Sequence, residues 1–232
     1  MKKENVSTDT ALIIPVYNEG KVIRRVVSLA LKRYKYVICV NDGSKDNSLE
    51  EIWAMGGGVH CIDHPINMGQ GAALQTGIEY ARVLPVKYFC TFDADGQHRF
   101  EDVAAMVEEI KKTKCDIVLG SRFRGKAVNM PHSKKIMLKL AVWFTNRTTG
   151  LKLTDTHNGL RVFNRKVAEE LQITLPDMAH ASEILEIVAA KKYRYSEIPV
   201  TIEYTAYSKS KGQSMINAIN IGFDTLLRRI TR

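Results

Sequence analysis

Runs of hydrophobic residues alternate with mixed polar and apolar stretches through the first half of the chain. Each run is followed by a polar loop; the runs cover residues 11–17, 36–40, 59–62, 87–92 and 116–120. A short, nearly continuous apolar run is typical of a strand that is buried on both faces, as in a parallel sheet. We therefore expect five strands joined by right-handed crossovers.

Between these runs, apolar residues recur at helical spacing. The first helix is predicted to open at Asn18 and Glu19 and to bury Val22, Ile23, Val26, Val27 and Ala30. A glycine-containing turn leads into a second helix that reaches about Arg82, and Phe100–Lys112 forms another. Strands that alternate with helices predict an α/β fold with a mainly parallel sheet flanked by helices.

The regular alternation stops after residue 121. A basic loop at 121–126 precedes the segment 133–144, which is apolar on nearly every side and basic at its start. Such a segment forms either a core helix or a helix that lies in a membrane interface. Further on we expect a polar turn into a strand at 155–163, a helix over 181–191, an edge strand at 198–202 that contains Pro199, a basic loop at 207–214 and a C-terminal amphipathic helix at 216–230.

No linker or repeat divides the chain, so one domain over residues 1–232 is the simplest organisation. Within it, residues 10–121 form the half with regular alternation, residues 122–205 the second half, and residues 206–232 the basic loop and C-terminal helix.

The composition narrows the class of partner. The net charge of +9 suits an anionic partner: nucleic acid, an anionic lipid surface or a phosphorylated substrate. No run of about 18 apolar residues indicates a transmembrane helix, and the first residues do not form a signal peptide. The four cysteines lack CxxC spacing, which indicates buried thiols in a reducing cytosol.

Candidate chemistry centres on Asp93 and Asp95, which directly follow the strand at 87–92. Residues i and i+2 of an extended backbone point the same way, so the two carboxylates can share a Mg²⁺ or Mn²⁺ ion. A solvated acidic turn is the alternative. Two other polar loops, 42–46 and 67–71, also follow predicted parallel strands and therefore reach the same sheet edge. Their convergence favours a functional site.

The motifs taken together resemble the family 2 glycosyltransferases of the GT-A fold over residues 10–205. The resemblance rests on Pro15-Val16-Tyr17-Asn18-Glu19, Asn41-Asp42-Gly43-Ser44, Asn67-x-Gly69-x-Gly71 and Asp93-x-Asp95-Gly96-Gln97-His98. Gly120-Ser121-Arg122 and Asp155-x-x-x-Gly159-Leu160-Arg161 are similar to the dolichyl-phosphate mannose synthase branch. The stretches 178–183 and 211–214 resemble a bacterial polyprenyl-phosphate subgroup from cell-surface polysaccharide pathways.

This resemblance implies roles for individual residues. It implies that Asp93, Asp95 and Gln97 hold Mg²⁺ or Mn²⁺ against the donor diphosphate, and that His98 either assists them or is a surface turn residue. Asp42 is expected to bond the nucleobase. The remaining donor contacts are expected from Pro15, Tyr17, Glu19, Gln70, Lys209 and Lys211. The 10–121 half is then the nucleotide-sugar half, and 122–205 the acceptor half.

The nature of the acceptor is left open by these residues. A sugar hydroxyl must lose a proton as it attacks, and Asp155 is the candidate base. A lipid phosphate is already ionised and needs cations instead, for which Arg is well suited. The candidate cations are Arg122, Arg124, Arg161, Lys209 and Lys211, with Arg122 and Arg161 favoured because they lie inside the matched motifs. Asp155 otherwise orients Arg161 or caps a turn.

The expected function is an inverting, metal-dependent transfer of glucose or N-acetylglucosamine from a UDP-sugar to undecaprenyl phosphate. The enzyme is expected to be peripheral at the cytoplasmic face of the cell membrane, where it modifies cell-surface polysaccharide, with a small membrane protein or a second copy as possible partners. The alternative acceptor is a hydroxyl of a lipid-linked oligosaccharide. A non-catalytic nucleotide-sugar sensor is remote, and so is a nucleic-acid-binding protein, because the chain lacks the motifs of such proteins.

Overall fold

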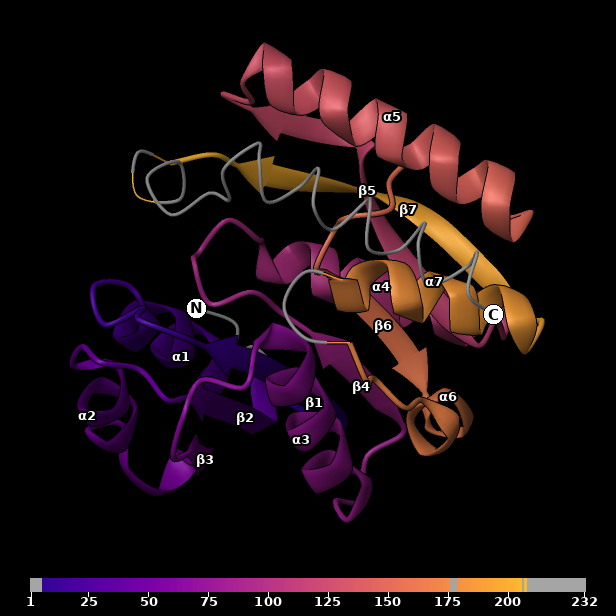
Figure 1. Cartoon of the computed structure of the whole chain (residues 1–232). Helices are drawn as coiled ribbons and strands as arrows, with labels where there is room; N and C mark the ends of the chain where they lie inside the picture. The colour runs from indigo at the N-terminus through magenta and orange to yellow at the C-terminus, as the bar shows by residue number, and fades with distance from the viewer. Residues whose placement is uncertain (1–5, 176–178, 206, 208–232) are drawn as a thin grey trace, which may run out of the picture.

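The computed structural model describes residues 6–175, 179–205 and 207, and its centre is a seven-stranded sheet (Figure 1). The strands lie in the order β3-β2-β1-β4-β6-β5-β7. Their bounds are β1 Ser7–Val16, β2 Tyr34–Asp42, β3 Val59–His64, β4 Tyr88–Thr91, β5 Ile117–Val128, β6 Arg161–Asn164 and β7 Tyr195–Glu203.

Pairing within the sheet is parallel except around β6. Strands β3, β2, β1 and β4 pair in parallel, and so do β5 and β7, whereas β6 runs antiparallel to both of its neighbours β4 and β5. The start of β6 therefore lies between the end of β4 and the first part of β5, and Arg161 pairs with Thr91 on one side and Leu119 on the other. The predicted α/β class with a mainly parallel sheet is confirmed.

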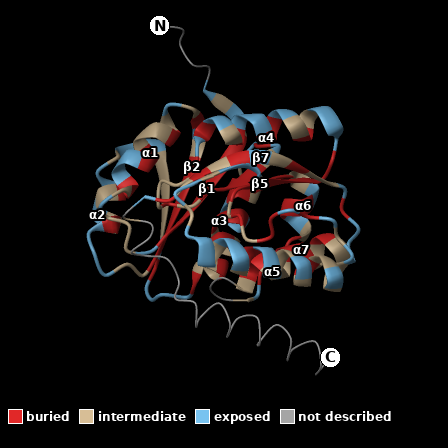
Figure 2. Ribbon diagram, turned by 90° about the horizontal axis from the view of Figure 1, so that it is seen from above, coloured by how far each residue is buried: buried red, intermediate tan, exposed pale blue. Residues whose placement is uncertain are grey.

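Helices cover both faces of the sheet (Figure 2). One face packs against α1 Ile23–Leu31, α2 Ser48–Trp53 and α4 Phe100–Thr113, and the other against α3 Gln70–Arg82, α6 Arg165–Glu170 and α7 His180–Ala190. A short 3₁₀ helix, η1, covers Gly56–Gly58. The longest of the described helices, α5 His132–Thr149, lies on the outside of the molecule, next to the ends of β5 and β7 in Figure 1.

Strand β1 shows how the two cores are divided. Leu12, Ile14 and Val16 point into the core beneath α1 and α4, whereas Ala11 and Ile13 point into the core beneath α3. All five are almost completely buried, as the continuous apolar run predicts for a central strand. The strand is thereby fixed on both faces, and its polar end is held rigidly at the sheet edge.

The predicted start of the first helix is wrong: α1 begins at Ile23, not at Asn18. The backbone N–H groups of Asn18 and Glu19 donate to the hydroxyls of Ser44 and Ser48, 26 and 29 residues away. Asn18 also has a left-handed φ of 55° and accepts from the backbone of Lys45. These long-range bonds join the two loops at the sheet edge and leave no local helix there.

Two predictions for the second half also need correction. Residues 121–126 are not a loop, because β5 continues to Val128 after an irregularity in its pairing with β7 between Ser121 and Lys126. The core-helix alternative for 133–144 is wrong as well, since Leu138 and Thr145 are the two buried residues of α5. Strand β7, by contrast, is an edge strand as Pro199 predicts. The basic loop at 207–214, apart from Tyr207, and the predicted C-terminal helix lie outside the described residues.

Within the part of the chain that the structure describes, no helix is long and apolar enough to cross a membrane.

Candidate active site

Asp93 and Asp95 lie just beyond the end of β4, where the neighbouring loops hold both carboxylates. Asp93 accepts a hydrogen bond from the Nε2 of Gln70 at 3.1 Å and bonds the Nε2 of His98 at 2.8 Å. Asp95 accepts from the backbone N–H of Gln97 at 3.0 Å and from its side-chain amide. The structure thus places Gln70, Gln97 and His98 around the carboxylate pair, and His98 is buried rather than a surface residue.

The pKa values of the two carboxyl groups shift in opposite directions. Burial alone would raise the pKa of Asp93, but the hydrogen bond and charge of His98, together with Arg161 and His180, lower it to about 2. The pKa of Asp95 is raised, first by burial and then by the negative charge of Asp93. Two partly buried carboxylates that repel each other are relieved by a shared cation. The pair therefore has the electrostatics of a cation site.

The donor set fits Mg²⁺ or Mn²⁺ rather than a fully protein-bound metal. Among the described residues, no group of three or more His, Cys, Asp or Glu side chains is placed to hold an ion. Hard divalent cations commonly bind one or two carboxylates and complete their shell with water and substrate phosphates. Gln97 points its amide nitrogen at Asp95, so to act as a ligand its amide must turn over.

Behind the carboxylates lies Arg161, which is 2% exposed. Within the described residues, its Nη1 has no hydrogen-bond partner. Burial lowers its pKa to about 10, although the nearby charges of Asp93 and Asp155 oppose this shift. A buried guanidinium with an unused donor is costly unless an anion completes it. Of the three predicted arginines, Arg161 is therefore the one with a buried guanidinium nitrogen that lacks a partner among the described residues.

Arg122 and Asp155 form a buried ion pair. Asp155 accepts from the backbone N–H of Arg122 at 3.0 Å and from its Nε at 2.6 Å. The other two guanidinium nitrogens donate to the hydroxyl of Tyr204 and the backbone carbonyl of His157, each at 2.7 Å. All three guanidinium nitrogens of Arg122 are thus engaged, and the side chain of Asp155 is 0% exposed. Arg124, the other candidate cation here, donates to the backbone carbonyl of Glu197.

Gly159 brings the start of β6 against the carboxylate pair. A Cβ at this position would lie 2.2 Å from Oδ2 of Asp93. The carbonyl of Gly159 also accepts from the hydroxyl of Thr91 at 2.6 Å. The motif that contains Asp155, Gly159 and Arg161 therefore packs directly on the end of β4.

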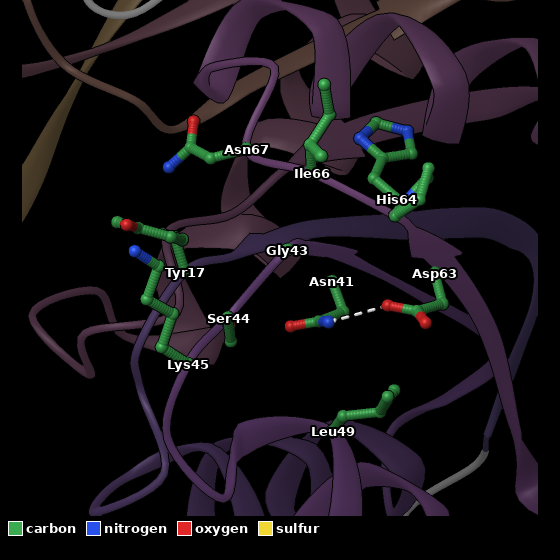
Figure 3. A pocket seen from close by; sticks show the side chains of 11 residues that line it. Tyr17, Asn41, Gly43, Ser44, Lys45, Leu49, Asp63, His64, Ile66 and Asn67 are labelled. Carbon is green, nitrogen blue, oxygen red and sulfur yellow. Dashed lines mark hydrogen bonds between the residues drawn. The ribbon is translucent and has the colours of Figure 1, made fainter.

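A pocket of about 510 Å³ opens beside the ends of β1, β2 and β3 (Figure 3). Tyr17 lines it, and its other lining residues include Asn41, Ser44, Lys45, Asp63 and Asn67; a contact of Tyr17 with the donor stays a prediction. Asn41 donates to Asp63 at 2.7 Å, the dashed line in Figure 3. The Oδ1 of Asn41 is buried, and within the described residues it has no partner. The pocket is therefore lined by an amide whose oxygen is unpaired among the described residues and by a carboxylate.

Asp42, the predicted base contact, lies at the end of β2 but is 2% exposed. Its two oxygens accept from the backbone N–H groups of Met68 at 2.9 Å and Gly69 at 2.8 Å, and it also bonds His64. Asp42 thus stabilises the turn that leads into α3. Its contact with a nucleobase stays a prediction, whereas Asp63 and Asn41 face the pocket.

The other residues predicted to contact the donor differ in their surroundings. Pro15 is buried within β1. Glu19 accepts a hydrogen bond of 2.7 Å from the hydroxyl of Tyr207, which brings the start of the C-terminal stretch to the donor loops. Lys209 and Lys211 lie outside the described residues.

Sequence reasoning missed Lys134 and Asp63. Lys134, in the first turn of α5, lies over the ring of Tyr204, with its Nζ 4.9 Å from the ring centroid. Burial and the charge of Arg122 lower its pKa, and the charge of Asp95 opposes them. The basic start of the segment 133–144 was the available signal for Lys134. For Asp63 the signal was its position at the end of the third strand, at the same sheet edge as the recognised motifs.

The chain is similar to several known proteins. A family model described as "Glycosyl transferase family 2" matches residues 11–172. A UDP-N-acetylglucosamine–dolichyl-phosphate N-acetylglucosaminyltransferase of Methanococcus voltae is 33% identical over 94% of this chain and 95% of its own length. A dolichyl-phosphate beta-glucosyltransferase of Trichomonas vaginalis is 30% identical over 89% of this chain and 69% of its own.

Among solved structures, glucosyl-3-phosphoglycerate synthase from Mycobacterium tuberculosis, in complex with Mn²⁺ and UDP-glucose, superposes with a TM-score of 0.70. The match covers 95% of this chain and 77% of that one at 13% identity, so it shows a shared fold.

Proposed function

Because the chain belongs to glycosyltransferase family 2 and is a glycosyltransferase, we propose that it transfers glucose or N-acetylglucosamine from a UDP-sugar to undecaprenyl phosphate. The reaction is inverting: a phosphate oxygen forms the new bond to the anomeric carbon as the bond to UDP breaks. The enzyme works as a peripheral protein at the cytoplasmic face of the membrane, for cell-surface polysaccharide.

One observation carries the choice of acceptor. The predicted base, Asp155, is engaged by a partner, whereas the predicted cation, Arg161, keeps a nitrogen without one among the described residues. The carboxylate of Asp155 is buried against Arg122, while the Nη1 of Arg161 lacks a partner among the described residues. A hydroxyl acceptor needs a base that can reach its proton. An ionised phosphate needs a cation instead. This arrangement favours a phosphate acceptor.

Different residues of the chain bind the nucleoside and the metal ion of the donor. The pocket that contains Tyr17, Asn41 and Asp63 takes the nucleoside, since an acceptor oxygen there can receive the N–H of a uracil ring. Asp93 and Asp95, with Gln97 after its amide turns, would hold Mg²⁺ or Mn²⁺. When bound, this ion neutralises negative charge on the departing nucleotide as a Lewis acid.

On the acceptor side, Arg161 and Lys134 position the phosphate. They approach the carboxylate pair from β6 and from α5, as their interactions with Asp93 and Asp95 indicate. Arg122 and Asp155 act through them, because their ion pair fixes the turn that precedes Arg161. The donor half at 10–121 and the acceptor half at 122–205 thus meet at one edge of a continuous sheet.

The choice of donor and lipid is supported by relatives. The protein of Methanococcus voltae is named for UDP-N-acetylglucosamine and dolichyl phosphate, and that of Trichomonas vaginalis for glucosyl transfer to dolichyl phosphate. The structural neighbour contains Mn²⁺ with UDP-glucose. A small membrane protein or a second copy of the chain is a further partner that this function admits.

The test is a donor screen with purified enzyme, undecaprenyl phosphate in detergent and either Mg²⁺ or Mn²⁺. Labelled UDP-glucose and UDP-N-acetylglucosamine are supplied separately, and both released UDP and lipid-linked sugar are measured. We expect one donor to yield an acid-labile lipid product in equal amount to UDP. UDP release without a lipid product from either donor would contradict the proposal.

A second candidate is transfer to a hydroxyl of a lipid-linked oligosaccharide. His98 is the observation in its favour, because its Nε2 bonds Asp93 while its Nδ1 has no partner among the described residues. A histidine held by a carboxylate is a common general base. This candidate predicts turnover with a lipid-linked sugar and none with undecaprenyl phosphate.

A further inference from the structure

Helix α5 exposes a row of three large apolar side chains. Ile136, Leu140 and Trp143 are 63%, 62% and 67% exposed. Their spacing of four and three residues places them within roughly 60° of one another around the helix. We call these three residues the α5 ridge. The pale blue stretches of α5 in Figure 2 mark its exposed residues.

The opposite side of the same helix is held by the protein. Leu138 and Thr145 are its buried residues, and Lys134 packs on the ring of Tyr204. Near 100° per residue, Lys134, Leu138 and Thr145 fall on one side, about 180° from Trp143. The helix is therefore fixed to the domain by one face and presents the ridge outward.

The charged residues of α5 itself all have one sign. The eighteen residues of α5 include no Asp or Glu. Lys135, Lys139 and Arg147 are exposed beside the ridge. A helix with a polar face rich in Lys and Arg and an apolar face with Trp and Leu is typical of those that lie in the plane of a membrane interface.

We propose that the α5 ridge inserts into the boundary between headgroups and acyl chains of an anionic bilayer, with Lys135, Lys139 and Arg147 on the lipid phosphates. The inference rests on the proposed function, because a polyprenyl phosphate acceptor resides in a membrane. It assigns the docking surface, which the peripheral location alone does not.

Charge argues against the other occupants of this face. A second copy that packed its own α5 ridge here would bring two sets of the same cations together at an isologous contact. The chain's own residues 208–232 contain five Lys and Arg residues and one Asp, so they repel the helix as well. An anionic lipid surface attracts it, with each basic residue near the surface contributing about a fivefold gain in affinity.

The geometry links docking to the site. Lys134 lies one residue before Lys135, on the side that faces Tyr204 and feels the charge of Asp95. A bilayer that contacts the ridge therefore lies against the outer side of α5. The inner side of the same helix carries Lys134, one of the proposed acceptor cations.

The chain provides its own reporter for this contact, since Trp53 and Trp143 are its two tryptophans. The full-length protein with Trp53→Phe reports Trp143 alone, and the full-length protein with Trp143→Phe reports Trp53, which is 60% exposed on α2. Each is mixed with vesicles of phosphatidylcholine and phosphatidylglycerol that contain brominated lipid and no polyprenyl phosphate. We expect vesicles to quench Trp143 and shift its emission to the blue, and to leave Trp53 unchanged.

Variants then measure the contribution of the ridge. Replacing Ile136, Leu140 and Trp143 by Ser should weaken binding to anionic vesicles by roughly tenfold per residue. Val83→Ser is the matched control, because Val83 is 79% exposed at the end of α3, and it should bind like wild type. Circular dichroism and UDP binding confirm that the triple variant is folded.

Two results would overturn the proposal. One is vesicle binding without quenching of Trp143, which would place the membrane contact elsewhere. The other is a Trp143 that iodide cannot quench in vesicle-free protein, which would mean that a second copy or another part of the chain covers the ridge. Because the vesicles contain no acceptor, the experiment does not depend on turnover. A failed donor screen with intact vesicle binding would reject the proposed function and leave the docking surface standing.

Discussion

The Nε of Arg122 donates to Oδ2 of Asp155 across 2.6 Å, and both side chains are almost completely buried. This ion pair joins β5 to the turn before β6 and thereby fixes the position of Arg161. A carboxylate that accepts two hydrogen bonds from its buried partner is not free to take a proton from a substrate. This pairing supports the proposed phosphate acceptor, which needs a cation and does not need Asp155 as a base.

The pair predicts the behaviour of Asp155→Asn. Breaking a buried ion pair from one side leaves an uncompensated charge, so the variant should lose about 3–5 kcal/mol in free energy of unfolding. Its turnover number per folded molecule should stay within about tenfold of wild type, since Asp155 only positions Arg161. Urea denaturation and initial rates at saturating substrate measure the two effects.

The control for this variant is the double change Asp155→Asn with Arg122→Met. If the two residues act as a pair, their destabilisations are not additive, and the cycle gives an interaction free energy of about 1–3 kcal/mol. Near-complete loss of turnover in folded Asp155→Asn, with donor binding intact, would instead identify Asp155 as a base for a hydroxyl acceptor.

Arg161 should contribute to acceptor binding. Replacing it by Met removes the buried cation with its unused Nη1 and should lower kcat/KM for undecaprenyl phosphate by roughly a hundredfold or more. Binding of UDP with metal, measured by calorimetry, should change by less than about threefold. The matched control is Arg124→Met, because Arg124 donates to a backbone carbonyl. Equal losses of donor and acceptor affinity in the Arg161 variant would argue against this assignment.

Gly159 should be intolerant of any side chain. The Cβ of Gly159→Ala would lie 2.2 Å from Oδ2 of Asp93, so the carboxylate must move. We expect metal-dependent UDP binding to weaken by about tenfold or more, because ligand geometry decides metal affinity. Gly57→Ala is the control, since a Cβ there meets nothing within 4 Å and the φ of Gly57 is not positive. If both variants bind UDP and metal like wild type, the packing of Gly159 on Asp93 is not functional.

His157 should make stability depend on pH. Burial, with the charges of Arg122 and Arg161, lowers its pKa from 6.5 to about 4, although Asp155 opposes the shift. As the pH falls, His157 therefore binds a proton near pH 6.5 in the unfolded chain, but only near pH 4 in the folded chain. The free energy of unfolding should fall by up to about 3 kcal/mol as the pH drops through this window.

Urea denaturation at a series of pH values measures this dependence. His157→Gln should flatten the slope between pH 6.5 and 4, whereas His132→Gln, at an exposed residue, should keep it. An unchanged slope in His157→Gln would assign the pH dependence to other groups.

The strands were predictable because their signal is local. Each central strand is a short apolar run that ends in polar residues, so the position of Asp93 and Asp95 at the sheet edge follows from sequence alone. The start of α1 was not predictable, because bonds from Asn18 and Glu19 to residues of the second loop decide it. A pattern within a short window carries no information about partners 26 or more residues away.

The same limit applies within the site. Arg122 and Arg161 look equivalent in sequence, since each lies in a matched motif. Only the antiparallel β6 and the pairing of Arg122 with Asp155 and Tyr204 distinguish the engaged arginine from the one with an unused donor. Lys134 depends likewise on the way α5 packs on Tyr204. The sequence shows which polar residues are present, but it does not show which of their atoms have hydrogen-bond partners.

The most direct test compares undecaprenyl phosphate with undecaprenol as acceptors, with the same labelled donor, metal and detergent. The two differ only in the phosphate, so the pair isolates the need for an ionised acceptor. Asp95→Ala sets the background: it should abolish metal-dependent transfer and keep the wild-type fold, because a half-buried carboxylate beyond a strand end contributes little to the core. We predict lipid-linked sugar from undecaprenyl phosphate and none above background from undecaprenol. Product from undecaprenol at a similar rate would contradict the account.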